Sequence, residues 1–261
     1  ALSYLFTGSM PDDELLASAD SGALANADEQ EKQAERLLQS ARGHQAVGAF
    51  MRDWLGLGKL ATVAQDDTVF KLTDSLRQAM GEETRRLIED ATFNQNGSFL
   101  SLLTSKTTFL NQELATHYGL ANAGSMGADF AQVTLAAGQR DGGLLAQGSL
   151  LTAMATAKES SPVQRGKLVR TRLLCQELPP PPANLNTALK PSSGGVTTRQ
   201  HFAEHSANPV CSSCHRRMDP IGFGFEHYDA FGRWRDQDNG HPVDATGSVE
   251  TDNESFAFDG L

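Results

Sequence analysis

Apolar residues recur every three or four positions through the first half of the chain, which is the spacing that gives a helix one apolar face. The pattern predicts helices over about 28–42, 44–56 and 73–92. Ser9, with the acidic residues that follow it, predicts the start of an earlier helix. The predicted fold class is therefore mainly α, beginning with a helical domain over residues 1–122.

The segment TTFLNQELATHYGL, residues 107–120, is expected to complete this domain as a further helix. Gly119 suits the left-handed conformation that often ends a helix, and His117 falls in the last turn. A histidine at that position is favoured by the helix dipole and needs no ligand role. Ligation of a metal is the alternative interpretation.

The composition changes near residue 121, where a glycine-rich stretch begins. One short strand is predicted over 130–135, followed by a helix over 144–157. We place the domain boundary in this stretch, which makes residues 136–261 the second domain. Asn239-Gly240 is a typical hairpin turn, so the second domain should carry a small C-terminal β-hairpin.

The second domain contains Cys211-Ser212-Ser213-Cys214-His215, the pattern of a haem-attachment site. Two thiols separated by two residues project to one side of a helical turn, where both can form thioethers with the vinyl groups of a porphyrin. The histidine that follows is placed to ligate the iron. The motif predicts one covalent haem c, with Cys211 and Cys214 as attachment residues and His215 as the proximal ligand.

Three other interpretations of this motif are weaker. A thioredoxin-like redox pair needs a strand–helix–strand context, which the flanking sequence does not supply. A zinc site needs four ligands, and the one further cysteine of the chain, Cys175, stands alone. A disulfide between residues three apart would be strained and would leave His215 unexplained.

The net charge of the chain argues against two classes of binding partner. The chain has 32 acidic against 22 basic residues and a net charge of −10, which argues against nucleic acid and against an anionic membrane surface. No apolar run approaches the length of a membrane span. Haem c is attached outside the bacterial cytoplasm, so the motif predicts a periplasmic, secreted or cell-surface protein. The abrupt ends of the sequence suggest a segment of a larger parent chain.

A predicted helix over 162–178, capped by Ser161, concentrates positive charge within this acidic chain. Its basic residues are Arg165, Lys167, Arg170 and Arg172. They predict either an exposed basic face or partners for haem propionates. Cys175, on the same helix, is expected to be buried as a small hydrophobic residue. The prolines that follow predict an extended polyproline segment from Pro179 to about Gly195.

The aromatic residues that follow the motif, in GFGFEHYDAFGRWR, are suited to wall a porphyrin. Asp219-Pro220 predicts that the motif helix ends there. Three carboxylates near the hairpin turn give it some likeness to a calcium loop: Asp236, Asp238 and Asp244. The glycine and glutamate spacing of an EF-hand is missing, so we interpret them as turn residues.

Five stretches together resemble the signatures of the planctomycete-type cytochrome-c-like family, which consists of large secreted bacterial proteins of poorly defined function: LNQELATHYGL, RDGGLLAQGSLL, SSPVQRGKLV, LPPPPAN and CSSCHRRMDPIGFGFEHYDAFGRWR. The resemblance implies a helical domain packed on a cytochrome-c-like haem domain, exported as part of a multidomain protein. It also marks His117 and His205, which fall where the family's motifs carry histidine. The family's flanking domains are missing here, which leaves any activity that depends on them undecided.

Electron transfer is the predicted function, because it requires only a haem held by protein ligands, with redox partner proteins still to be identified. A haem enzyme of the peroxidase or oxygenase type is the alternative. It requires an open or displaceable sixth site with acid–base groups nearby, whereas the histidines and carboxylates of this chain are scattered. A non-redox module that binds surface polymers is the third class, which haem staining of a denatured gel separates from the other two.

The sixth iron ligand must come from the face of the porphyrin opposite His215. Met218 follows His215 by three residues and lies on the same side of a helix, so it cannot reach that face. His117 belongs to the other domain and ends a helix whose last turn can present an imidazole outward. We predict axial ligation by His215 and His117, with His205 as the second choice and Met154 as the third. This pairing requires the two domains to pack together around the haem.

Overall fold

The structure is a computed structural model that describes residues 1–95, 97–136, 138, 140–179, 195–206, 209–251 and 254–261. The predicted polyproline segment lies almost entirely outside these residues. The described chain is mainly α-helical with small two-stranded sheets, as the sequence predicts.

The first half of the chain forms helices, most of which begin at a polar cap. These helices are α1 (Leu2–Thr7), α2 (Asp13–Asp20), α3 (Ala27–Leu38), α4 (Ala41–Trp54), α5 (Asp74–Glu89), α6 (Phe99–Thr104) and α7 (Gln112–His117). In α2 to α5 the side chain just before the helix accepts a hydrogen bond from a first-turn backbone N–H. The predicted helices over 28–42, 44–56 and 73–92 correspond to α3, α4 and α5.

Two predicted helix boundaries in this half are wrong. Asp12 caps α2 by accepting from Leu15 N at 3.0 Å, in place of a start at Ser9. Gly43, which separates the predicted helices over 28–42 and 44–56, lies instead in the first turn of α4, where a Cβ would come within 2.2 Å of the Leu38 carbonyl oxygen. The glycine therefore allows α4 to begin directly after α3.

The segment TTFL, predicted as the start of a helix, is strand β1 (Thr107–Leu110). It pairs antiparallel with β2 (Ala131–Thr134), the strand that the sequence does predict. Thr108 and Leu110 are buried while their neighbours are half-buried, which is the alternation of a strand with one face on the core. The helix α7 begins only after Asn111, whose side chain accepts from Leu114 N at 3.0 Å.

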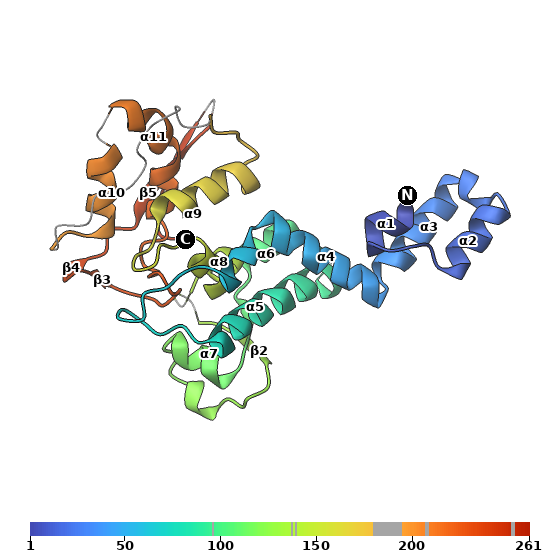
Figure 1. Cartoon of the computed structure of the whole chain (residues 1–261), viewed down its shortest axis with the longest axis horizontal. Coiled ribbons are helices and arrows are strands. Elements are labelled where there is room, and N and C mark those ends of the chain that lie inside the picture. Colours follow the sequence, from blue (N-terminus) through green and yellow to red (C-terminus); the bar gives the residue numbers. More distant parts are fainter. Residues whose placement is uncertain (96, 137, 139, 180–194, 207–208, 252–253) are drawn as a thin grey trace.

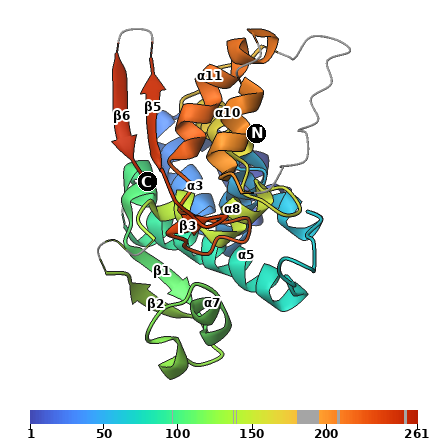
Figure 2. The same cartoon turned by 90° about the vertical axis from the view of Figure 1, so that its left-hand side faces the viewer.

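The second half contains α8 (Gly148–Ala153), α9 (Pro162–Leu168), α10 (Thr198–Ser206) and α11 (Pro209–Phe223). Strands β3 (Gln237–Asp238) and β4 (His241–Pro242) flank Asn239-Gly240, so the predicted turn is confirmed, although its arms are two residues each. The larger C-terminal hairpin is β5 (Thr246–Glu250) with β6 (Ser255–Asp259). Figure 2 shows it standing beside α10 and α11.

One apolar cluster joins the two halves of the sequence. Leu87 and Leu114 from the first half share it with Leu144, Leu150 and Phe231 from the second, and each of these side chains is at most 1% exposed. Figure 1 shows α8 lying against α5 at the centre of the molecule, with α1 to α3 at one end of the long axis and α9 to α11 at the other. The halves therefore share a core, which lies between α5 and α8.

Hydrogen bonds between buried polar groups also join the two halves of the chain. Glu83 of α5 is 1% exposed and accepts hydrogen bonds from the Tyr118 hydroxyl at 2.6 Å and the Thr108 hydroxyl at 2.7 Å. The Tyr118 hydroxyl in turn accepts from Gly148 N, at the start of α8, at 3.0 Å. Burial raises the pKa of Glu83, and the Arg140 guanidinium over the Tyr118 ring opposes that rise. This network fixes α8 against α5 and α7.

Helices α9 and α11 cross in backbone contact. A Cβ built on Gly166 of α9 would lie 2.0 Å from the Met218 carbonyl oxygen, and one on Gly222 of α11 would lie 1.9 Å from the Pro162 carbonyl oxygen. Gly247 of β5 approaches α11 in the same way, with 2.1 Å between its built Cβ and the Pro220 carbonyl oxygen. Because only glycine tolerates such contacts, these three residues position α11.

Candidate functional site

The candidate site is helix α11, which carries all three residues of the predicted attachment motif. Cys214 and His215 follow Cys211 by three and four residues, so the three side chains share one face of the helix. Both cysteines are unpaired, with Cys211 buried and Cys214 partly exposed. The motif helix thus presents two thiols and one imidazole together, as the sequence predicts.

The helix continues past Asp219-Pro220, where the sequence predicts a break, and ends at Phe223. Proline lacks the N–H that would bond to the carbonyl of Arg216, which normally weakens a helix. Here α11 is held on two sides, by α9 at Gly222 and by β5 at Pro220. Packing therefore overrides the local preference, and Met218 stays on the buried side of an unbroken helix with 6% exposure.

The ring of His215 is fixed by a carboxylate one helical turn further on. Its Nδ1 lies 3.1 and 3.0 Å from the two carboxylate oxygens of Asp219, which is 2% exposed. The Ser206 hydroxyl, at the end of α10, donates to the same carboxylate at 2.5 Å. A carboxylate that accepts from Nδ1–H selects the tautomer with the lone pair on Nε2, the nitrogen that can ligate a metal. The sequence-based site did not include Asp219 or Ser206.

These residues fit the covalent haem that the motif predicts. Two unpaired thiols and an imidazole lie on one helix face, and the imidazole Nδ1 is hydrogen-bonded to a carboxylate, as is usual for histidines that ligate a metal through the other ring nitrogen. A zinc site has less support, because the described residues include no group of three or more His, Cys, Asp or Glu side chains placed to hold a metal ion.

His117 does not meet α11 in this structure. Its Nε2 lies 2.8 Å from the Phe231 carbonyl oxygen, and its ring packs against Phe70 with the centroids 5.3 Å apart. In both views α8 lies between α7 and α11 (Figures 1 and 2). Burial lowers the pKa of His117, as expected for an imidazole that serves as a neutral donor. Its position does not support the predicted role as sixth ligand.

Met154 and His205 are the other predicted ligands, and His227 is a further histidine of the segment after the motif. Met154 is 6% exposed in the central core, and a Cβ built on Gly56 would lie 3.3 Å from its methyl group. His227 stacks on Trp234 with centroids 4.4 Å apart, and its Nδ1 lies 2.9 Å from the Arg235 carbonyl oxygen. The side chain of His205, on α10, lies outside the described residues.

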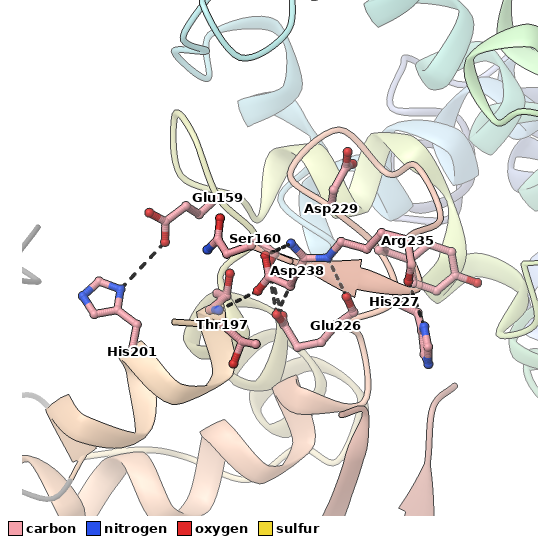
Figure 3. A network of polar contacts seen from close by, with 12 residues as sticks. Glu159, Ser160, Thr197, His201, Glu226, His227, Asp229, Arg235 and Asp238 are labelled. Atoms are coloured by element: carbon pink, nitrogen blue, oxygen red, sulfur yellow. Dashed lines mark hydrogen bonds and ion pairs between the residues drawn. The ribbon is translucent and has the colours of Figure 1, made fainter. Parts of the chain in front are cut away.

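A buried ionic network lies at the start of α10 (Figure 3). Arg235 donates to Glu226 Oε2 at 2.8 Å, to Asp238 Oδ1 at 2.7 Å and to the Ser160 hydroxyl at 3.0 Å. The second oxygen of Asp238 accepts from the backbone N–H of Thr198, the first residue of α10, at 2.5 Å. Glu226 is 2% exposed, and its burial raises its pKa against the effect of Arg235. The network therefore anchors the start of α10. Asp238, one of the three carboxylates interpreted as turn residues, belongs to it.

Arg165 is completely buried, which corrects the prediction that it lies on an exposed face or pairs with propionates. Its guanidinium donates to four backbone carbonyl oxygens: Phe225 at 3.2 Å, Tyr228 at 2.7 Å, Leu151 at 3.3 Å and Asp229 at 2.6 Å. Burial lowers its pKa to about 10. Arg165 thereby holds the loop after α11 against α8.

The other residues of the predicted basic helix divide between the interior and the surface. Arg170, in the helical turn Val169–Leu173 that follows α9, is 2% exposed and donates to the Glu250 carbonyl oxygen at 3.1 Å, so it ties this turn to β5. Lys167 and Arg172 are exposed, as predicted. Cys175 is exposed with φ of +51°, so the prediction that it is buried is wrong.

The aromatic residues after the motif are mostly used for packing. Phe225 and Tyr228 form a small buried cluster with α8, and Phe231 belongs to the central core. Trp234 is 41% exposed. A separate groove of about 1010 Å³ lies between α4 and α5, lined in part by His44, Glu89 and Phe93. None of the residues that line it belongs to α9, α10 or α11.

A mainly helical fold that presents a Cys-x-x-Cys-His helix is typical of cytochrome-c-like proteins. Two family models match the chain: PSD4, a protein of unknown function (DUF1592), over residues 1–120, and PSCyt3, a protein of unknown function (DUF1588), over residues 141–238. Both models describe planctomycete cytochrome-c-like domain families, which supports the resemblance found in the sequence.

Neither the curated proteins nor the solved structures include a match to this chain. Within the part of the chain that is described, no helix has the length and apolar character needed to cross a membrane.

Proposed function

We propose that α11 holds one haem c through thioethers to Cys211 and Cys214, with His215 as the proximal ligand, and that the chain is an electron-transfer module of a larger exported bacterial protein. The observation that carries the proposal is the shared face of two unpaired thiols and an imidazole whose Nδ1 is held by Asp219. The cytochrome-like family supports it. A bound haem supplies a reversible one-electron change at iron.

The chain's own residues give this module its rigidity. The thiols fix the cofactor to α11, and Asp219 orients the imidazole, so the proximal ligand need not move between oxidation states. The glycine contacts with α9 and β5 hold α11 itself. Because thioether attachment takes place outside the bacterial cytoplasm, the proposal includes a periplasmic, secreted or cell-surface location.

Intact mass spectrometry of the chain produced with a haem c maturation system tests the attachment. We expect the mass of one haem on the wild type and on Cys175→Ser, which alters the exposed third cysteine. The double variant Cys211→Ser/Cys214→Ser should carry none. A wild-type chain without covalent haem, or one with stoichiometric zinc, would contradict the proposal.

A haem enzyme of the peroxidase or oxygenase type is the second candidate. It is favoured by the positions of His117 and Met154, which are engaged in the core and not beside α11. Carbon monoxide separates the two functions, because it binds reduced haem only when the sixth site is open or displaceable. Reduced protein that takes up no carbon monoxide would support electron transfer, and rapid uptake by the wild type would favour the enzyme.

The same spectra test the predicted sixth ligand. Ligation by His117 requires that His117→Ala convert a six-coordinate, low-spin haem into a high-spin form. From the hydrogen bond to Phe231 we expect no such change.

A further inference from the structure

Asp219 is a buried carboxylate in direct contact with the proposed proximal ligand. It is 2% exposed, and both of its oxygens lie within 3.1 Å of His215 Nδ1. Ser206 holds it from α10, so the carboxylate cannot rotate away without losing a second hydrogen bond. Among the described ion pairs its partner is His215, and no lysine or arginine pairs with it there. Its negative charge is therefore directed at the imidazole.

A charge in this position has a defined effect on a redox centre. The oxidised iron carries one more positive charge than the reduced iron, so a nearby buried carboxylate stabilises the oxidised state more. The hydrogen bond from Nδ1–H to a carboxylate also makes the imidazole a stronger electron donor through Nε2. Both effects act in the same direction.

We propose that Asp219 sets the reduction potential of this site, holding it below the value that His215 would give with a neutral hydrogen-bond partner. The inference rests on the proposed function and adds to it a positioning residue, which acts on the iron only through His215. A low potential suits a module that passes electrons onward to an acceptor and does not retain them. Ser206 contributes to this effect, since its hydrogen bond keeps the Asp219 carboxylate in place.

Asp219→Asn tests the proposal because asparagine has the shape of aspartate and an oxygen that can still accept from Nδ1–H, but carries no charge. We expect a higher reduction potential, with the ratio of reduced to oxidised protein at a fixed ambient potential raised about tenfold, which corresponds to about 59 mV for one electron. If this variant yields no holoprotein, Asp219→Ser removes the same charge with a smaller side chain.

Asp20→Asn is the matched control, because it removes the same charge from the exposed surface of α2 at the other end of the molecule. Its potential should equal that of the wild type. Holoprotein whose potential is unchanged or lowered by Asp219→Asn would overturn the inference and leave the proposed function standing. Absence of covalent haem from the wild type would overturn both.

Discussion

Arg165 shows how a single side chain can organise a loop. A fully buried guanidinium is tolerated here because its partners are four backbone carbonyl groups of the segment after α11 and of α8. Arg165→Met should destabilise the protein by about 3 kcal/mol or more, since it leaves several buried carbonyl oxygens without that donor. Urea unfolding followed by circular dichroism measures the loss.

Lys167→Met, on the same helix but exposed, is the control and should change stability by about 0.5 kcal/mol or less. Equal effects of the two substitutions would show that the carbonyl contacts of Arg165 contribute little.

His117 should make stability depend on pH. Burial lowers its pKa from 6.5, so the folded chain holds the neutral ring while the unfolded chain takes up a proton first as the pH falls. Its contribution is therefore fully present above about pH 6.5 and is lost as the pH falls towards its folded pKa. In unfolding titrations between pH 7.5 and 5, His117→Gln should lose less stability than the wild type. Parallel losses would contradict this assignment.

At the residue scale, the placement of the motif residues on one helix face was predictable, whereas the ionic network at the start of α10 was not. Cys211, Cys214 and His215 are adjacent in sequence, so helical spacing alone places them on one face. The contact of Asp219 with His215 could also have been predicted, because a residue four positions after a helical histidine can contact its ring. The ionic network could not be predicted, because Ser160 and Arg235 are 75 residues apart and only the tertiary fold brings them together.

At the scale of elements, α11 depends on glycines in its neighbours. A methyl group at Gly166 would overlap the Met218 carbonyl oxygen, and neither backbone can move without disturbing the α9–α11 crossing. We expect Gly166→Ala to destabilise the protein by about 1–3 kcal/mol and to lower the yield of holoprotein. Thermal unfolding and haem absorbance per mole of protein measure the two effects.

Gly81→Ala in α5 is the matched control, because nothing lies within 4 Å of a Cβ built there. Alanine is the better helix former, so this change should stabilise by about 0.5–1 kcal/mol. Two variants that destabilise alike would mean that the crossing tolerates a methyl group.

The helices were predictable from sequence wherever a cap and an apolar period coincide, as they do for α3, α4 and α5. The prediction failed at TTFL, because four residues are too few to distinguish the apolar period of a strand from that of a helix. Pairing with β2 makes this segment a strand. It failed again at Pro220, where packing against Gly247 outweighs the missing N–H. In both cases a partner distant in sequence outweighs the local preference.

At the scale of the whole molecule, the two matched segments are packed together through α5 and α8, while the motif helix packs on α9, α10 and β5. The predicted association of the halves is therefore explained by the central core and needs no haem between them. That core includes Leu144 and Leu150, which are completely buried against residues of the first half. Separated halves would expose this surface to water.

Cleavage between residues 121 and 140, where most of the described residues are exposed, should leave the halves associated. Limited proteolysis followed by size-exclusion chromatography under native conditions should give a nicked chain that elutes with the intact protein, and the halves should separate only in denaturant. Burial of the Glu83 and Tyr118 network strengthens this expectation, because Tyr118 would lose its contact with Gly148 on separation. Two halves that elute apart, each with native circular dichroism, would show that the shared core is dispensable and that the boundary near residue 121 divides independently folding domains.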